Sequence, residues 1–188
     1  NVCSSDLIDD VNYDGSIRAF LFLLNNDCCT SIDKSRVFLS DLTGGKLNIS
    51  KGMISRLNRE FALKTEPERR SAYADMLLSP VMHTDCTNAR ENGKSCQVYV
   101  CATPDGKALY FARENMHNHL LFLHDIWVPA TNNEAERLLR NYKRKQAQAV
   151  TFRSFESIDY LCQCMSMLVL MRFEDPANIY DRVSRIFG

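Results

Sequence analysis

One carboxylate in the last third of the chain stands at the head of a strongly basic segment. Glu136 is followed, from Arg137 to Arg153, by six Arg or Lys side chains and by no acid. A carboxylate can bind a divalent cation and clustered cations can bind a phosphate backbone, so the pattern is typical of a metal-binding acid beside nucleic acid. The alternative is a solvated helix in which Glu136 pairs with Arg140 one turn later, an arrangement that needs no function.

The composition restricts where such chemistry could act. The chain has 188 residues, 45% hydrophobic and 24% charged, which predicts a globular protein of one domain or of one domain with an appendage. Its formal net charge is zero, so any contact with nucleic acid must come from a local patch of cations. The longest apolar run, Leu161 to Met171, is interrupted by Gln163 and is too short to cross a bilayer, so no membrane partner is expected.

The cysteines and histidines do not predict a zinc site. Eight cysteines are present and no signal peptide is recognisable, so we expect free thiols in a reducing cytoplasm. Neither Cys28-Cys29 nor Cys162-Gln163-Cys164 has the Cys-x-x-Cys spacing that closes a tetrahedral site. His117, His119 and His124 form a weak metal pattern for which ordinary polar or capping roles are the better explanation.

Apolar residues recur at helical spacing in four segments of residues 8–79, which predicts a helical N-terminal region. The second and third of these helices, joined through Gly44-Gly45, resemble a helix-turn-helix with Lys51, Arg56 and Arg59 on its outer face. A plain helical hairpin explains the same pattern, because a polar outer face is the default for any amphipathic helix.

The period then changes to that of strands. Three strands are predicted, at Val81 to Thr87, Gln97 to Ala102 and Ala108 to Ala112, and further helices begin after Thr131, Ser154 and Pro176. The last two strands are joined by Pro104-Asp105-Gly106, which gives Asp105 a structural role in a turn. We therefore expect an α+β protein with about three antiparallel strands and helices before and after them.

Residues 1–7 differ from the rest of the chain. Val2 to Leu7 resembles the translation of a sequencing-library adapter, so this segment is expected to be a non-native terminus. The alternative is a genuine but disordered terminus.

Several motifs together resemble the insertion-sequence-66 family, a branch of the DDE transposases. The similarity extends from about Val11 to Phe187 and is carried mainly by two motifs, Val81 to Thr87 with Asn92-Gly93-Lys94, and Thr131 to Arg137. Supporting matches are Arg144-Lys145, Phe152-Arg153-Ser154 and Asn178-Ile179-Tyr180.

This resemblance implies a ribonuclease-H-like core within residues 80–188 and DNA strand cleavage and transfer by two Mg²⁺ or Mn²⁺ ions. It also implies transposon ends and target DNA as partners and a bacterial cytoplasmic location, and it permits a homo-oligomer.

The resemblance assigns roles residue by residue. Asp85 matches the first catalytic acid and Glu136 the third, and both would bind metal. Lys143, on the same helical face as Glu136, would contact DNA near the cut. The remaining cations of the helix would contact backbone phosphates without specifying sequence, and they are Arg137, Arg140, Arg144 and Lys145. Taken alone, Asp85 is better explained as an acid at the end of a strand that caps a turn with Thr87, and the surrounding motif is what favours the catalytic role.

The chain departs from the family at its second acid. A central block that carries this acid is missing, and the deletion lies near residues 114–118, so the core is expected to be partial and its sheet edges exposed. Asp125 is the nearest replacement, and we interpret it as structural. Portions that bind DNA and zinc at the family's N-terminus are also missing here.

With one carboxylate gone, too few ligands remain for two ions, so the chain is expected to be an inactive transposase. The alternatives are a non-catalytic DNA-binding remnant and an unrelated helical interaction module in which Asp85 and Glu136 lie far apart.

Overall fold

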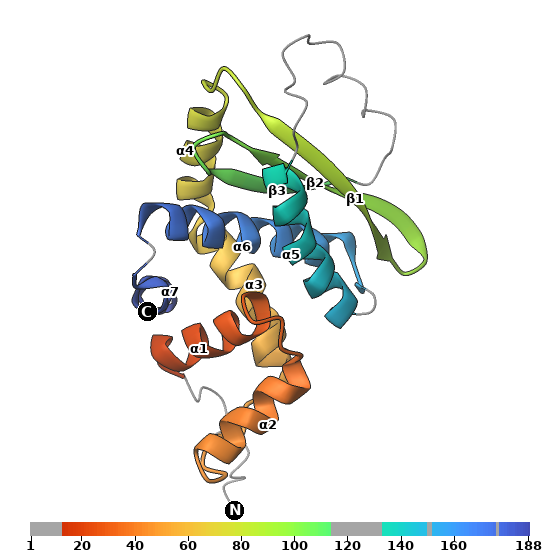
Figure 1. Cartoon of the computed structure of the whole chain (residues 1–188). Coiled ribbons are helices and arrows are strands. Elements are labelled where there is room, and N and C mark those ends of the chain that lie inside the picture. Colours follow the sequence, from red (N-terminus) through yellow and green to blue (C-terminus); the bar gives the residue numbers. More distant parts are fainter. Residues whose placement is uncertain (1–12, 114–132, 150–151, 176) are drawn as a thin grey trace, which may run out of the picture.

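The computed structural model describes residues 13–113, 133–149, 152–175 and 177–188. These residues form seven α-helices and one three-stranded antiparallel sheet, with four helices before the sheet and three after it (Figure 1). The predicted α+β class, with helices before and after three antiparallel strands in the sequence, is therefore confirmed. The terminus at residues 1–7, the deletion point near 114–118, Asp125, Thr131 and the three histidines after Arg113 lie outside the described residues.

The N-terminal helices begin at residues whose side chains or backbones favour a helix start. Ser31 accepts a hydrogen bond from the Lys34 amide, and Ser50 accepts one from the Met53 amide at 3.1 Å. Gly44 and Gly45 adopt positive φ angles of 60° and 79° and end the second helix, as predicted. The four elements are α1 (Gly15–Asn26), α2 (Ile32–Leu42), α3 (Lys51–Lys64) and α4 (Glu66–Met76).

The sheet has the simple order β1-β2-β3, with β1 (His83–Glu91), β2 (Lys94–Ala102) and β3 (Ala108–Arg113). The first two strands are longer than predicted because they form a tight hairpin through Asn92 and Gly93. These two residues have φ angles of 45° and 83°, the left-handed conformation that two-residue hairpin turns require. The first strand therefore continues past Thr87 to Glu91.

Three helices follow the sheet, α5 (Asn133–Ala149), α6 (Phe155–Glu174) and α7 (Ile179–Phe187). In Figure 1, α6 runs beneath the sheet and above α1, α2 and α3, and α5 lies along the sheet at β1. Ser154 caps α6 by accepting a hydrogen bond from the Ser157 amide. Among the described residues, no helix combines the length and the apolar character that crossing a membrane requires.

Two clusters of buried side chains meet at α6. The first joins α6 to α1, α3 and α7, and there Phe22 stacks on Phe61 with ring centroids 4.3 Å apart. The second lies between the sheet and the pair α5 and α6, and it contains Val100, Tyr110 and Tyr142. Because α6 contributes to both clusters, it is apolar on most of its circumference, as expected for a central helix.

Helix α6 also covers one edge of the sheet. The Ser166 hydroxyl accepts a hydrogen bond from the Tyr110 amide of β3 at 2.8 Å and donates one to the Cys162 carbonyl at 2.8 Å. The prediction of exposed sheet edges is therefore wrong for β3, because a buried helix with a hydroxyl side chain takes the place of a neighbouring strand.

Candidate functional site

Helix α5 carries most of the predicted site residues, and its buried stripe fixes their directions. Ala135, Leu138, Leu139 and Tyr142 are buried at 0–3% exposure against the sheet and α6. With this stripe facing inward, the remaining positions form two exposed rows at spacings of three and four residues.

The first row consists of Glu136, Arg140 and Lys143, all exposed. One Glu136 carboxylate oxygen lies 3.7 Å from an Arg140 guanidinium nitrogen, so the pair expected from the spacing is present. The two side chains retain 51% and 71% of their exposure, so solvent screens the pair and its contribution to stability is small. Lys143 shares the helical face of Glu136, as its spacing predicts.

The second row consists of Arg137, Asn141 and Arg144. The Arg137 guanidinium donates two hydrogen bonds to the Glu134 carboxylate, one of them from Nε at 3.0 Å. These bonds are the largest cause that lowers the pKa of Glu134, and the nearby His83 lowers it further. Arg144 is exposed and has no ion pair with any residue that the structure describes.

Lys145 differs from the other cations of α5, because it is only 5% exposed. Its ammonium group donates hydrogen bonds to the backbone oxygen of Asn25 and, at 2.7 Å, to Asn25 Oδ1. Both oxygens belong to Asn25, which lies near the end of α1. The expectation that Lys145 contacts DNA phosphates does not fit this position, because the cation is enclosed by the protein and already hydrogen-bonded.

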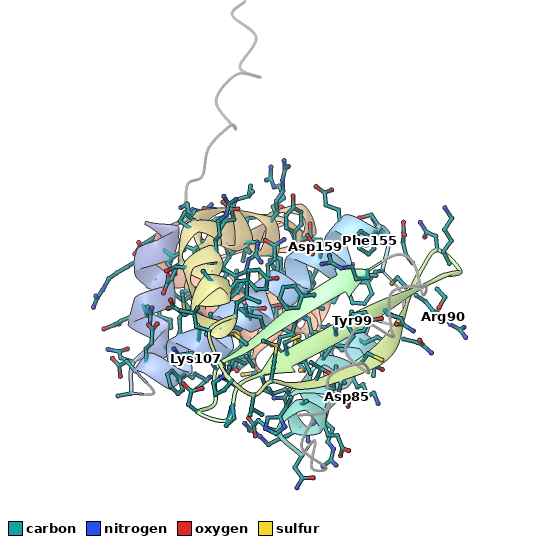
Figure 2. The ribbon with its side chains drawn as sticks, turned by 90° about the horizontal axis from the view of Figure 1, so that it is seen from above. Asp85, Arg90, Tyr99, Lys107, Phe155 and Asp159 are labelled. Atoms are coloured by element: carbon teal, nitrogen blue, oxygen red, sulfur yellow. The ribbon has the colours of Figure 1, made fainter. Side chains whose placement is uncertain are left out.

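Asp85 lies on β1 opposite Val100, so both side chains point to the face of the sheet that α5 covers. Figure 2 looks onto the sheet with Tyr99 at its centre and shows Asp85 at the side where α5 lies. Helix α5 runs alongside β1, and Gln146 near the end of α5 donates a hydrogen bond to the Asn88 carbonyl at 3.1 Å. Asp85 Oδ1 itself accepts a hydrogen bond from the Cys86 amide at 2.8 Å.

The described residues do not fit a two-metal site. Among them, no group of three or more His, Cys, Asp or Glu side chains is placed to hold a metal ion. Asp85 and Glu136 are two carboxylates, one hydrogen-bonded to the backbone and one beside a guanidinium. Two hard divalent ions need more anionic oxygen ligands than this pair supplies.

A cleft of about 470 Å³ opens beside the second row of α5. Its lining includes Arg137, Asn141 and Arg144 of α5, together with Arg172 from α6 and Asp27 after α1. Arg172 and Asp27 carry no signal in the sequence, because no motif connects them and only the packing of α1, α5 and α6 brings them together.

No family model, no curated protein and no solved structure matches this chain.

Proposed function

We propose that this chain is a DNA-binding protein derived from a transposase of the insertion-sequence-66 type, with a partial ribonuclease-H-like core and no strand-cleavage activity. The observation that supports DNA binding is the concentration of cations on α5. Four are exposed on this one helix, in a chain whose formal net charge is zero, and they are Arg137, Arg140, Lys143 and Arg144.

Binding through these side chains would be directed to phosphates. Arg140 and Lys143 lie on the outer face of α5, where a duplex could approach without displacing any buried side chain. Such contacts release condensed counterions and carry little sequence information, so affinity should fall steeply as salt rises. Two of the four cations are partly neutralised, Arg137 by Glu134 and Arg140 by Glu136, so only moderate affinity is expected.

Cleavage is left out of the proposal for a chemical reason. Asp85 and Glu136 would be the ligands of any Mg²⁺ or Mn²⁺ inherited from the family, and together they do not supply a two-metal site. The proposed activity is therefore the one that needs cations alone.

The test is DNA binding by fluorescence anisotropy, with a labelled duplex and a series of salt concentrations. Replacing Arg140 and Lys143 together by Gln should reduce the slope of log affinity against log salt by about two, since each lost phosphate contact removes about one unit. The matched control replaces two exposed lysines away from α5, Lys46 and Lys94, by Gln and makes the same change in net charge.

A selective loss in the α5 variant supports the proposal. Equal losses of DNA affinity in both double variants would show that only net charge matters. If the unmodified protein shows no salt-dependent binding, the proposal that it binds DNA is wrong.

A further inference from the structure

The cleft beside α5 is a candidate ligand site that is separate from the outer face of the helix. Its volume of about 470 Å³ lies in the range of small-molecule sites. Segments distant in the sequence build it, namely the end of α1 with the residues that follow, the β2–β3 turn at Gly106, α5 and α6.

The polar side of the cleft favours an anion. Three guanidinium groups line it, from Arg137, Arg144 and Arg172, against the single carboxylate of Asp27. Arg172 is held by an ion pair with Asp27, while Arg137 is held by Glu134, which does not line the cleft. The planar guanidinium matches the oxygens of a phosphate group, so two held guanidinium groups and the exposed one of Arg144 together suit a phosphate.

The rest of the lining is largely apolar and includes an aromatic ring. Leu138, Met165 and Leu168 contribute aliphatic and thioether surface, and the Phe173 side chain is 43% exposed. Lys107 Nζ lies 5.9 Å from the centroid of the Phe173 ring, and Figure 2 shows Lys107 at the end of the sheet nearest α4. An accessible aromatic ring next to cations is the arrangement on which nucleobases stack.

Asn26 adds a buried acceptor to the same cleft. Its Nδ2 donates hydrogen bonds to the Phe22 carbonyl at 3.0 Å and to Asn58 Oδ1 at 2.8 Å, which fixes the orientation of the amide. Its Oδ1 is buried and has no donor among the residues that the structure describes. The amide of Asn26 is therefore a rigid part of the lining.

We propose that this cleft binds a nucleotide, with the phosphate at Arg144 and Arg172 and the base against Phe173. The inference goes beyond DNA binding by the outer face of α5, because Arg172, Phe173 and Asn26 belong to other elements. A ligand without a negative charge would leave Arg144 without an ion pair among the described residues, and a phosphate without a ring would leave the apolar part of the lining uncovered.

The experiment is isothermal titration calorimetry of the whole chain with adenosine monophosphate, ribose 5-phosphate and adenosine. Adenosine monophosphate should bind more tightly than either fragment. Arg172→Gln should weaken its binding by about tenfold or more, the usual effect of losing a hydrogen bond to a charged group. Phe173→Leu should weaken the binding of adenosine monophosphate and leave the affinity for ribose 5-phosphate unchanged. A purely structural effect would weaken the binding of both ligands.

Arg140→Gln is the control, because Arg140 is an exposed cation of α5 that does not line the cleft. It should keep the affinity for adenosine monophosphate while it lowers the affinity for duplex DNA, so the two proposals succeed or fail separately. Thermal unfolding verifies that each variant is folded. Equal affinity for adenosine and its monophosphate, unchanged binding in Arg172→Gln, or no saturable binding at millimolar ligand would overturn the nucleotide site.

Discussion

The Lys145 ammonium group and Asn25, two residues that lie 120 positions apart in the sequence, connect α5 to the end of α1. Lys145 Nζ donates to the backbone oxygen of Asn25 and lies 2.7 Å from its Oδ1. Burial lowers the pKa of Lys145 to about 8, and the neighbouring thiols of Cys29 and Cys164 oppose this shift only in part. Arg144 and Asn26, the neighbours of Lys145 and Asn25 in the sequence, line the cleft.

This buried amine predicts a specific dependence of stability on pH. Its pKa in the folded protein, about 8, is lower than in the unfolded chain, so between the two values the unfolded state binds more protons. The free energy of unfolding should therefore rise with pH in this window. Between pH 7 and pH 9.5, the free energy of unfolding of the unmodified protein should rise by about 2 kcal/mol more than that of Lys145→Met, as measured by urea unfolding. A difference between the two proteins that does not change with pH would contradict the lowered pKa.

Ser166 should be needed for stability, because it replaces a strand at the edge of β3. Its hydroxyl is fully buried and accepts the Tyr110 amide hydrogen at 2.8 Å. Ser166→Ala leaves that amide buried without a partner and should cost about 1–3 kcal/mol in chemical unfolding. Ser71→Ala, at an exposed position of α4, is the control and should change little. A Ser166→Ala protein as stable as the unmodified one would mean that α6 shifts to restore the bond.

Two helical glycines should respond oppositely to alanine. A Cβ at Gly15 would lie 2.5 Å from the Ser184 carbonyl oxygen of α7, whereas a Cβ at Gly52 would meet nothing within 4 Å. Gly15→Ala should therefore separate α1 from α7 and destabilise the fold by about 1–3 kcal/mol. Gly52→Ala should stabilise it by up to about 1 kcal/mol through helix propensity. Thermal unfolding of both variants measures this, and stabilisation by both would argue against a close α1–α7 contact.

Local signals in the sequence predicted much of the fold. Ser50 and Ser154 begin helices where their hydroxyls satisfy free amides, because capping depends only on neighbouring residues. The hairpin at Asn92-Gly93 was equally accessible, since Asn-Gly is a strong turn signal. The predicted first strand nevertheless ends at Thr87, because the family motif that contains Asn92 and Gly93 implies no turn, whereas β1 continues to Glu91.

Features that depend on packing could not be predicted in the same way. The position of Lys145 in the basic run does not reveal its burial, because its oxygen partners belong to α1. The cleft likewise combines Asp27 and Arg172, whose ion pair exists only when α1 and α6 lie side by side. Helical periodicity did place Glu136, Arg140 and Lys143 in one row, because that relation lies within a single element.

The carboxylates Asp85 and Glu136 should not support catalysis of DNA cleavage. Both match acids of the family, yet no third metal-binding side chain accompanies them among the described residues. Supercoiled plasmid incubated with the protein and Mg²⁺ or Mn²⁺ should therefore be nicked no faster than plasmid incubated with the metal ion alone. The variants Asp85→Ala and Glu136→Ala should behave like the unmodified protein. Asp105→Ala, which alters a turn acid, serves as the control. Metal-dependent nicking that both site variants abolish and the control retains would mean that further ligands come from another part of the chain or from a second copy, and the protein would then be an active nuclease or transposase.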